Sequence, residues 1–571
     1  MYKKSCYESY YRIAKEVRAF AKHALNEIDL YLIISGILAV CDNKSLQSNE
    51  EISACVGEGD EAVAQAVGLA LSMVDFGSVR GLAETTNATD LESALSLGPW
   101  SASSREGSFS TPAGVAKLAL AILDVKPNEK VLDCGSGTGT FLLNALQAIP
   151  SIEAVGIELN PGVYAASVIR ARHAHVDIDY RNGDAFVIAG DNGKEKTFDK
   201  AFSNYPWGLR TMDLAGTSEY IDDMIKGLDR GGRPVHADWA FNKLLVDSIK
   251  DGGKAVAIMS AGAAFVGRDV PMRKRFVENG WISAVVALPT GAFAPYSMIS
   301  TCLVVLSHGE KSVRFVDATD LGAVARRTTD LDEESISEVI ARLNEDSDKS
   351  RLVSFDEIAA RDYDLCAERY LFKEIEVPNG VPFGSVVKRI TRGAAVGAKK
   401  LDDLSSSEET SVGYLNVRSI NDGRIDDDLP SLREVEPKFE KYLVQDGSLV
   451  LSKAINTIKF AVAEVPEGRK VLASSNLYVV ELDREKMNPY FLAAFLASPT
   501  GKELLSRAAV GTTLLSLPVA NLNEVKVPLP PLDEQESVAN AYRAKLDEIK
   551  VLKLQLERSR QELSDIFDEE G

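Results

Sequence analysis

The tetrapeptide Asn204-Tyr205-Pro206-Trp207 places two carbonyl groups next to an aromatic side chain. The side-chain carbonyl of Asn204 and the main-chain carbonyl of Tyr205 can accept the two hydrogens of an exocyclic amino group. Such a nitrogen is a poor nucleophile because its lone pair is delocalised into the ring, and two acceptors would help to pyramidalise it and aim the lone pair at an electrophile. Trp207 can stack on a base that has been flipped out of a duplex. The tetrapeptide therefore predicts a site that activates the amino group of an extruded adenine.

A glycine-rich turn upstream predicts a cofactor site. Gly135, Gly137 and Gly139 follow an apolar run and precede the apolar face of a helix. Glycines let the backbone approach a ligand closely at the carboxyl edge of a parallel sheet, where such folds bind cofactors. The next apolar run ends in Glu158, about 20 residues later, where a carboxylate can accept hydrogen bonds from ribose hydroxyls.

A third carboxylate follows the next expected strand. Asp184 could accept a bond from an adenine amino group, with Phe186 against the ring. Three such positions at successive strand ends are more specific than a glycine-rich turn alone, since dinucleotide-binding domains use such turns too. A dehydrogenase would also need a nicotinamide half-site, and the sequence shows none.

Short apolar runs that alternate with helical stretches must position these residues. The runs are rich in Val, Ile and Ala and cover residues 130–133, 154–157, 198–202, 254–258, 282–288 and 302–306. This alternation is typical of a doubly wound α/β domain, which we predict over residues 101–325.

The rest of the chain divides into four further parts that differ in composition and in the periodicity of their apolar residues. Residues 1–100 have helical periodicity and few Gly or Pro, which predicts an α-helical N-terminal domain. Residues 326–377 are charged and helix-prone and predict a helical linker. Strand-like pieces with turn signals return over 378–530. A final helix, 531–571, begins after Pro531.

The cofactor and tetrapeptide residues resemble two known sets of motifs. The first is the S-adenosylmethionine motifs of class I methyltransferases, a Rossmann-like fold. By that resemblance Asp133 would lie near the amino-acid part of the cofactor, Glu158 on the ribose and Asp184 on the adenine. The second is the (Asp/Asn)-Pro-Pro-aromatic motif of amino methyltransferases, from which this chain departs because Tyr205 replaces the first Pro.

A segment upstream of the glycine-rich turn indicates which methyltransferases the chain resembles. Residues 107–112 are similar to the segment that precedes the fold in the methylation subunits of type I restriction systems, and Phe109, Thr111 and Pro112 match. The resemblance spans roughly residues 1–372. It implies that the matching residues contact the cofactor, and it favours adenine in DNA over ribosomal RNA or protein glutamine as the acceptor.

Residues 378–571 resemble one target-recognition domain of a type I specificity subunit, with its spacer helix. The resemblance implies double-stranded DNA as a partner, and a separate restriction (nuclease) subunit is a further expected partner. Nine basic residues could contact phosphates or base edges, although a solvated basic face is the more common explanation for any one of them: Lys388, Arg389, Arg392, Lys399, Lys400, Arg418, Arg424, Lys453 and Lys459.

Specificity subunits usually carry two such domains, and this chain carries one, so we predict that two chains pair through their terminal helices. Apolar residues recur at heptad spacing from Ile549 to Ile566, over fewer than three heptads. Packing of that helix within its own chain is therefore an equally good explanation.

The composition limits the kinds of site and of partner that the chain can have. The formal net charge of −20 argues against a general nucleic-acid binder, so the positive charge must gather on one face. Six scattered cysteines and only five histidines predict no metal site and no disulfide framework. The longest apolar run, residues 30–41, is too short to cross a bilayer and predicts a buried helix. We expect a cytoplasmic protein without a membrane partner.

Two alternatives keep the same fold. One is a bifunctional restriction-modification enzyme, for which we find no convincing nuclease motif. The other is a catalytically weak homologue that only docks on DNA, because Tyr205 alters the tetrapeptide.

Overall fold

The structure is a computed structural model that describes residues 4–97, 111–191, 196–226, 235–294, 297–325, 328–371, 375–455, 458–509 and 515–570. Phe109 lies outside these residues. The chain forms two compact units, Met1–Phe372 and Lys373–Gly571, which are described separately. The division lies close to the predicted start of the DNA-reading half at residue 378.

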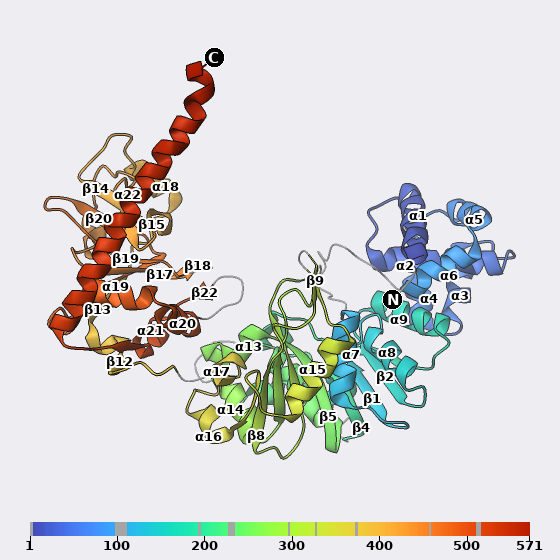
Figure 1. Cartoon of the computed structure of the whole chain (residues 1–571). Coiled ribbons are helices and arrows are strands. Elements are labelled where there is room, and N and C mark those ends of the chain that lie inside the picture. The colour runs from blue at the N-terminus through green and yellow to red at the C-terminus, as the bar shows by residue number, and fades with distance from the viewer. Residues whose placement is uncertain are drawn as a thin grey trace. The chain divides into compact units, whose positions relative to one another are not determined.

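The first unit begins with six helices (Figure 1), namely α1 (Lys4–Phe20), α2 (Glu27–Asp42), α3 (Asn49–Gly57), α4 (Glu61–Leu71), α5 (Phe76–Thr85) and α6 (Ala88–Leu97). Helix α2 is the centre of this group, because nearly all of its residues between Leu30 and Val40 are buried. Asn26 caps its first turn by accepting a bond from the backbone of Asp29. The predicted buried helix at residues 30–41 is confirmed.

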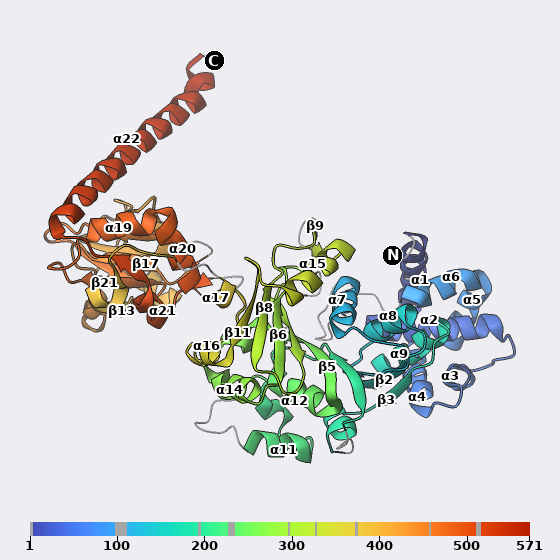
Figure 2. The same cartoon turned by 60° about the horizontal axis from the view of Figure 1, so that its bottom comes forward.

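A nine-stranded sheet forms the core of the first unit (Figure 2). Its strand order is β11-β8-β6-β7-β5-β4-β1-β2-β3. The strands are β1 (Lys130–Cys134), β2 (Glu153–Glu158), β3 (Asp179–Asn182), β4 (Phe198–Ser203), β5 (Ile249–Ser260), β6 (Ile282–Ala287), β7 (Thr301–Leu306), β8 (Ser312–Asp317) and β11 (Ser350–Ser354). The five strands from β5 to β3 in this order run parallel, whereas β7 is antiparallel to both β5 and β6.

Helices cover both faces of this sheet. One face packs against α7 (Ala113–Leu123), α8 (Thr140–Ala148) and α15 (Glu333–Asn344). The other packs against α12 (Asp238–Ser248), α14 (Val270–Glu278) and α16 (Phe355–Ala359). The predicted doubly wound α/β fold is confirmed, and each apolar run named above lies in one of its strands.

The predicted helical linker at 326–377 differs from the structure. It contains α15, α16 and α17 (Glu368–Leu371), but also β11, which pairs antiparallel with β8 and forms the edge of the sheet. Ser350 and Val353 of β11 are buried on the sheet, whereas Arg351 and Leu352 are exposed. This short strand is specified by its pairing with β8, which the local composition does not reveal. The short pair β9 (Ala323–Ala325) and β10 (Thr328–Asp330) adds a hairpin nearby.

The second unit is built on an antiparallel sheet in the order β13-β21-β17-β19. Its strands are β13 (Val387–Arg392), β21 (Leu477–Leu482), β17 (Leu449–Ser452) and β19 (Phe460–Val462). A parallel pair, β14 (Val412–Leu415) with β20 (Lys470–Ala473), and a hairpin, β15 (Ile420–Asn421) with β16 (Arg424–Ile425), lie outside this sheet. The expected mixed α/β character is confirmed.

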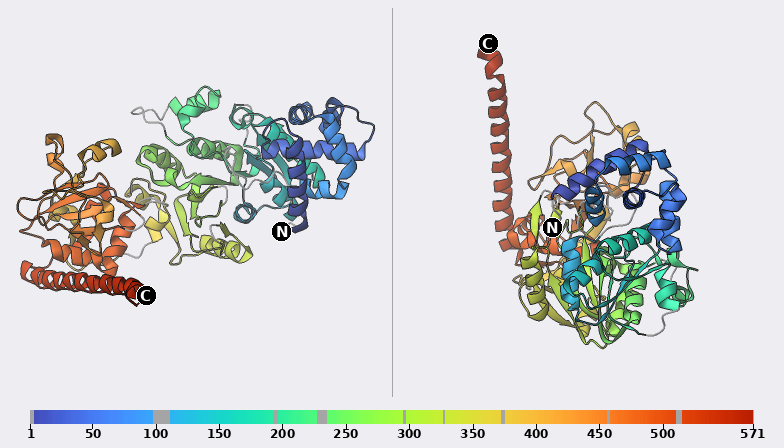
Figure 3. Two further views of the ribbon diagram at one scale, coloured as in Figure 1. Left: turned by 90° about the horizontal axis from the view of Figure 1, so that it is seen from above. Right: turned by 90° about the vertical axis from the view of Figure 1, so that its right-hand side faces the viewer.

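Helices α19 (Pro489–Ala497), α20 (Pro499–Ala508) and α21 (Val519–Glu524) precede the final helix α22 (Leu532–Glu570), one continuous helix in Figure 3. As predicted, it begins just after Pro531. Ala539 and Leu546 of α22 are buried within the unit, whereas the large apolar residues from Ile549 to Leu563 are exposed.

In the described residues, no single helix has the length and apolarity to cross a membrane. Helices α4 and α5 satisfy that test only when taken together, and they are bent by 94°.

Candidate active site at the carboxyl edge of the sheet

Four parallel strands end at one edge of the first unit's sheet. The chain passes from β1 through β2 to β3 on one side and then returns to β4 on the other side of β1. Crevices at such a reversal of strand order are where open α/β sheets bind ligands. The predicted site residues follow the ends of these strands, so the topology brings them together.

A cavity of about 770 Å³ opens at this edge, within the usual range for small-molecule sites. The predicted residues that line it are Gly135, Gly137, Glu158, Asp184, Phe186, Asn204, Tyr205 and Pro206. Among the described residues, Thr111, Pro112, Asp133, Gly139 and Trp207 do not belong to its lining.

The glycine turn has two different functions. Gly135 and Gly137 have φ values of +77° and +55°, and a Cβ added to either would meet nothing within 4 Å, so they form an open cradle at the cavity. Gly139 also has a positive φ, but a Cβ there would lie 2.1 Å from the hydroxyl of Tyr180. Gly139 is therefore required for packing against Tyr180, and its predicted contact with a cofactor gains no support.

Glu158 is held by the backbone around the cavity. One carboxylate oxygen accepts a bond from the amide of Gly137 (2.9 Å), and the other accepts one from the amide of Asn160 (2.8 Å). Burial raises the pKa of Glu158, and these amide bonds oppose that rise. Because each carboxylate oxygen has a second acceptor site, Glu158 can also receive the two hydroxyls of a ribose.

Asp133 is fully buried beside Glu158. Burial, followed by the repulsion from Glu158, raises the pKa of Asp133 well above its usual range. Within the described part of the chain, its Oδ1 atom has no hydrogen-bond partner. An unsatisfied buried oxygen behind an open glycine cradle is consistent with a ligand that carries a donor, such as the amino group of a bound amino acid.

Asp184 and Phe186 act as a pair. The carboxylate of Asp184 lines the cavity and accepts a bond from the amide of Phe186 (2.8 Å). The ring of Phe186 is 2% exposed and packs on Phe241, with centroids 4.7 Å apart. Phe186 thus fixes Asp184 from the core side.

The carboxamide of Asn204 is oriented by a residue far away in sequence. Its Nδ2 atom donates to Oγ1 of Thr111 at 3.1 Å, across 93 positions of the chain. The structure places Thr111 next to the tetrapeptide, and its expected contact with the cofactor stays a prediction. The local sequence carries no signal for this contact.

Tyr205 is anchored in the core. Its side chain is 1% exposed, its ring stacks on Phe241 (4.9 Å, 14°), and its hydroxyl donates to Oδ1 of Asn242 (3.0 Å). Burial raises the pKa of Tyr205 well above its usual range, so the hydroxyl stays protonated. A proline would stiffen this turn through its ring; here the buried side chain holds the main-chain carbonyl instead.

Trp207 lies half-buried on another side of the tetrapeptide. Its Nε1 atom donates to the carbonyl of Ile258 (3.2 Å), and its ring meets Phe293 edge-on at 4.8 Å. Sequence reasoning missed Phe241, Asn242 and Phe293. Phe241 and Asn242 lie within α12 and Phe293 lies in a turn beyond β6, so only their closeness to the tetrapeptide in space identifies them.

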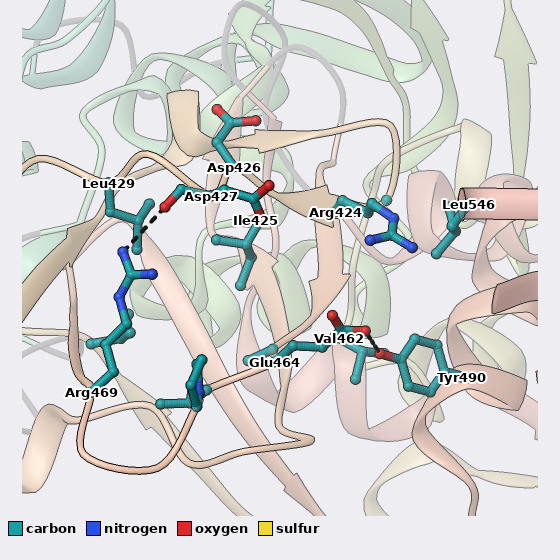
Figure 4. A pocket seen from close by; sticks show the side chains of 15 residues that line it. Arg424, Ile425, Asp426, Asp427, Leu429, Val462, Glu464, Arg469, Tyr490 and Leu546 are labelled. Atoms are coloured by element: carbon teal, nitrogen blue, oxygen red, sulfur yellow. Dashed lines mark hydrogen bonds between the residues drawn. The ribbon is translucent and has the colours of Figure 1, made fainter. Parts of the chain in front are cut away.

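Several of the predicted DNA contacts in the second unit are engaged with acidic side chains. The ion pairs are Lys388–Asp483, Arg389–Glu481, Lys400–Glu436 and Arg424–Asp547. Arg424 belongs to a small pocket between the β15–β16 hairpin and α22, where Arg469 donates to the carbonyl of Asp427 and Tyr490 donates to Glu464 (Figure 4). Lys453, the residue directly after β17, is in no ion pair among the described residues.

Comparison with known proteins matches two different families to the first and second units of the chain. Residues 96–377 match the N-6 DNA methylase family, and residues 398–551 match the type I restriction modification DNA specificity domain. The chain is 26% identical over 320 residues to the type I restriction enzyme MjaVIII methylase subunit of Methanocaldococcus jannaschii, covering 50% of this chain and 53% of that protein. It is 22% identical over 296 residues to the MpnII methylase subunit of Mycoplasma pneumoniae, covering 47% and 54%.

The chain thus spans about half the length of the curated relatives it matches. Among solved structures, the methyltransferase subunit of a type I restriction-modification system from Streptococcus thermophilus is 19% identical, with a TM-score of 0.46 over 64% of this chain and 98% of that one. Each family match covers about three quarters of one unit, and residues 1–95 lie outside both matches. The chain therefore joins, in one polypeptide, a region that matches the N-6 DNA methylase family to a region that matches the type I restriction modification DNA specificity domain.

Proposed function

We propose that the chain transfers the methyl group of S-adenosylmethionine to N6 of an adenine in DNA. One observation supports this most directly: Asn204 and Tyr205 border the same cavity as the Gly135–Gly137 cradle and the carboxylates of Glu158 and Asp184. The relatives' names, methylase subunits of type I restriction enzymes, agree with this activity.

The proposed roles of the residues follow from their positions. S-adenosylmethionine supplies an electrophilic methyl group. Glu158 would accept bonds from the ribose, Asp184 from the adenine edge, and Asp133 would lie towards the amino-acid part. The carbonyls of Asn204 and Tyr205 would hold the two hydrogens of the target N6, so that its lone pair points at the methyl carbon. The methyl donor would leave as a thioether when the new C–N bond formed, and N6 would release one proton to water, since neither the Asn204 nor the Tyr205 carbonyl is basic enough to keep it.

The test is transfer of tritiated methyl groups to DNA by the full chain. The Asn204→Ala variant should lose transfer by at least about a hundredfold, as expected for removal of one preorganised polar group. It should keep its affinity for S-adenosylhomocysteine, measured by calorimetry. Asn344→Ala, an exposed asparagine on α15, is the matched control and should transfer normally. Label that never appears on DNA with the unaltered chain would refute the proposal.

The second unit is proposed to read double-stranded DNA, with a second copy of the chain completing the site. Beyond Leu546, α22 exposes Ile549 (38%), Leu552 (55%), Leu556 (51%) and Leu563 (70%), at spacings that place them on one face. A like helix would cover that face. Leu556→Asp should convert a dimer into a monomer in sedimentation, and an unaltered chain that stays monomeric with and without DNA would contradict pairing.

A separate restriction subunit is the remaining proposed partner. The names of the relatives place them in restriction enzymes, which supports the proposal. Co-purification of the chain with a nuclease encoded beside it would test this.

A further inference from the structure

The N-terminal helices form one wall of the cavity at the sheet edge. Asn26, Ile28, Asp29 and Leu32, at the start of α2, and Ala66 and Leu69, on α4, belong to its lining. Leu159 and the start of α9 (Pro161–His173) line the same cavity. The lining residues that come from the cofactor motifs follow the strands of the sheet, whereas this wall comes from helices outside those motifs.

This wall is fixed to the sheet through α9. Tyr164, Ala165, Ala166 and Ile169 of α9 belong to the same hydrophobic core as α2 and α4. Polar contacts reinforce the packing: the hydroxyl of Tyr164 donates to Asp60 (2.7 Å). In addition, Arg172 donates to the carbonyls that end α3, at 2.6 and 3.1 Å. The helices therefore cannot move away from the cavity without breaking a buried interface.

The wall presents apolar side chains that nothing in the described chain covers. Leu69 is 69% exposed and Leu159, which directly follows Glu158, is 65% exposed, yet both line the cavity. Large exposed apolar side chains that line a pocket mark a place where an apolar surface of a ligand is buried. Adenine has that character, because its two faces are apolar and only its edges form hydrogen bonds.

We propose that Leu69, together with Ile28, covers the adenosyl group of the cofactor, so that the N-terminal helices are part of the cofactor site. This inference rests on the proposed function. The adenine edge is directed to Asp184 and the ribose to Glu158, so the ring lies between Leu159 and the helical wall. The methionine part would lie towards Asp133 and Gly135, neither of which belongs to the helical wall, so Leu69 acts on affinity for the adenosyl group and not on the methyl transfer itself.

The test measures binding to the full chain by calorimetry, with S-adenosylhomocysteine and adenosine as probes. Leu69→Ala should weaken both by about threefold to tenfold, the effect of losing part of a buried leucine contact, and Leu69→Asp by about a hundredfold. Leu69 is mostly exposed, so these changes should leave folding intact, which circular dichroism would verify. Leu352→Asp is the matched control, because Leu352 is a half-exposed leucine of β11 in the same unit and outside the cavity.

Three results would overturn the inference. If the unaltered chain binds S-adenosylhomocysteine and the Leu69→Asp variant binds it equally well, the wall does not touch the cofactor, while the proposed function stands. If Leu69→Asp weakens S-adenosylhomocysteine but not adenosine, the assignment to the adenosyl group is wrong. If the unaltered chain binds neither probe, the proposed function is refuted and the inference with it.

Discussion

Replacement of Tyr205 tests how the tetrapeptide is held without its usual first proline. Tyr205→Phe removes the hydroxyl that donates to Asn242, and both side chains are buried. The Oδ1 atom of Asn242 then loses its donor in the core, which should lower the free energy of unfolding by about 1–3 kcal/mol. The ring still stacks on Phe241, so the main-chain carbonyl stays in place and methyl transfer should fall only a few-fold.

Tyr205→Ala removes the ring as well. Loss of a large buried aromatic side chain should cost about 3–5 kcal/mol in stability. The turn is then free to move, and a displacement of about 1 Å at a reacting group can cost about a hundredfold in rate. The two variants thus separate the stability of the anchor from the position of the carbonyl.

Stability can be followed in the first unit alone, because all four tryptophans lie there: Trp100, Trp207, Trp239 and Trp281. Urea titration with tryptophan fluorescence gives the free energy, and tritiated methyl transfer gives the activity. Tyr31→Phe is the control, since its buried hydroxyl donates to Leu95 in the N-terminal helices (3.0 Å), far in sequence from the tetrapeptide. A folded but inactive Tyr205→Phe, or a Tyr205→Ala variant with the original rate, would refute this reasoning.

Three further changes give simple outcomes. Gly137→Ala places a side chain at a φ of +55°, which should cost about 1–2 kcal/mol in stability. The change should also lower the affinity for S-adenosylhomocysteine, measured by calorimetry, and an unchanged affinity would argue against the glycine cradle. Asp133→Asn should stabilise the first unit, relative to the unaltered chain, increasingly as the pH rises above about 4. A carboxyl whose pKa is raised in the folded state ionises first in the unfolded chain, so the unaltered protein loses stability as the pH rises; a difference independent of pH in urea titrations would contradict this. Lys550→Asp removes the ion pair with Asp427 and should lower the free energy of unfolding by less than about 1 kcal/mol in low salt, since both side chains are exposed. Thermal unfolding followed by circular dichroism should show that adding Asp427→Lys restores the stability.

The strands and the turns after them could be predicted because their signals are local. An apolar run that leads to Gly135 or Glu158 identifies both the strand and the edge at which it ends. The strand before Asp184, β3, has the sequence Asp-Tyr-Arg-Asn and no such run. Parallel strands place those ends side by side, so the convergence of these residues on one cavity followed from the fold class alone. Their roles towards a cofactor stay predictions.

The remaining features depend on contacts between distant residues. The sequence places Gly139 in the cradle, but in the structure Tyr180 occupies the space that a Cβ on Gly139 would need. Thr111 matches a cofactor motif, but its partner is Asn204. Arg424 looks like a DNA contact, yet Asp547, 123 positions later, neutralises it. Neither spacing nor composition encodes these pairs.

The sharing of α9 between the N-terminal helices and the sheet affects how the chain is made. Residues 4–97 leave the ribosome before α9, whose Tyr164 and Ile169 complete their core. At a synthesis rate of about 5–20 residues per second, that delay lasts on the order of several seconds. During this interval α2 and α4 expose apolar surface that has no intramolecular partner yet, so the nascent N-terminus should depend on chaperones more than a self-contained helical domain would.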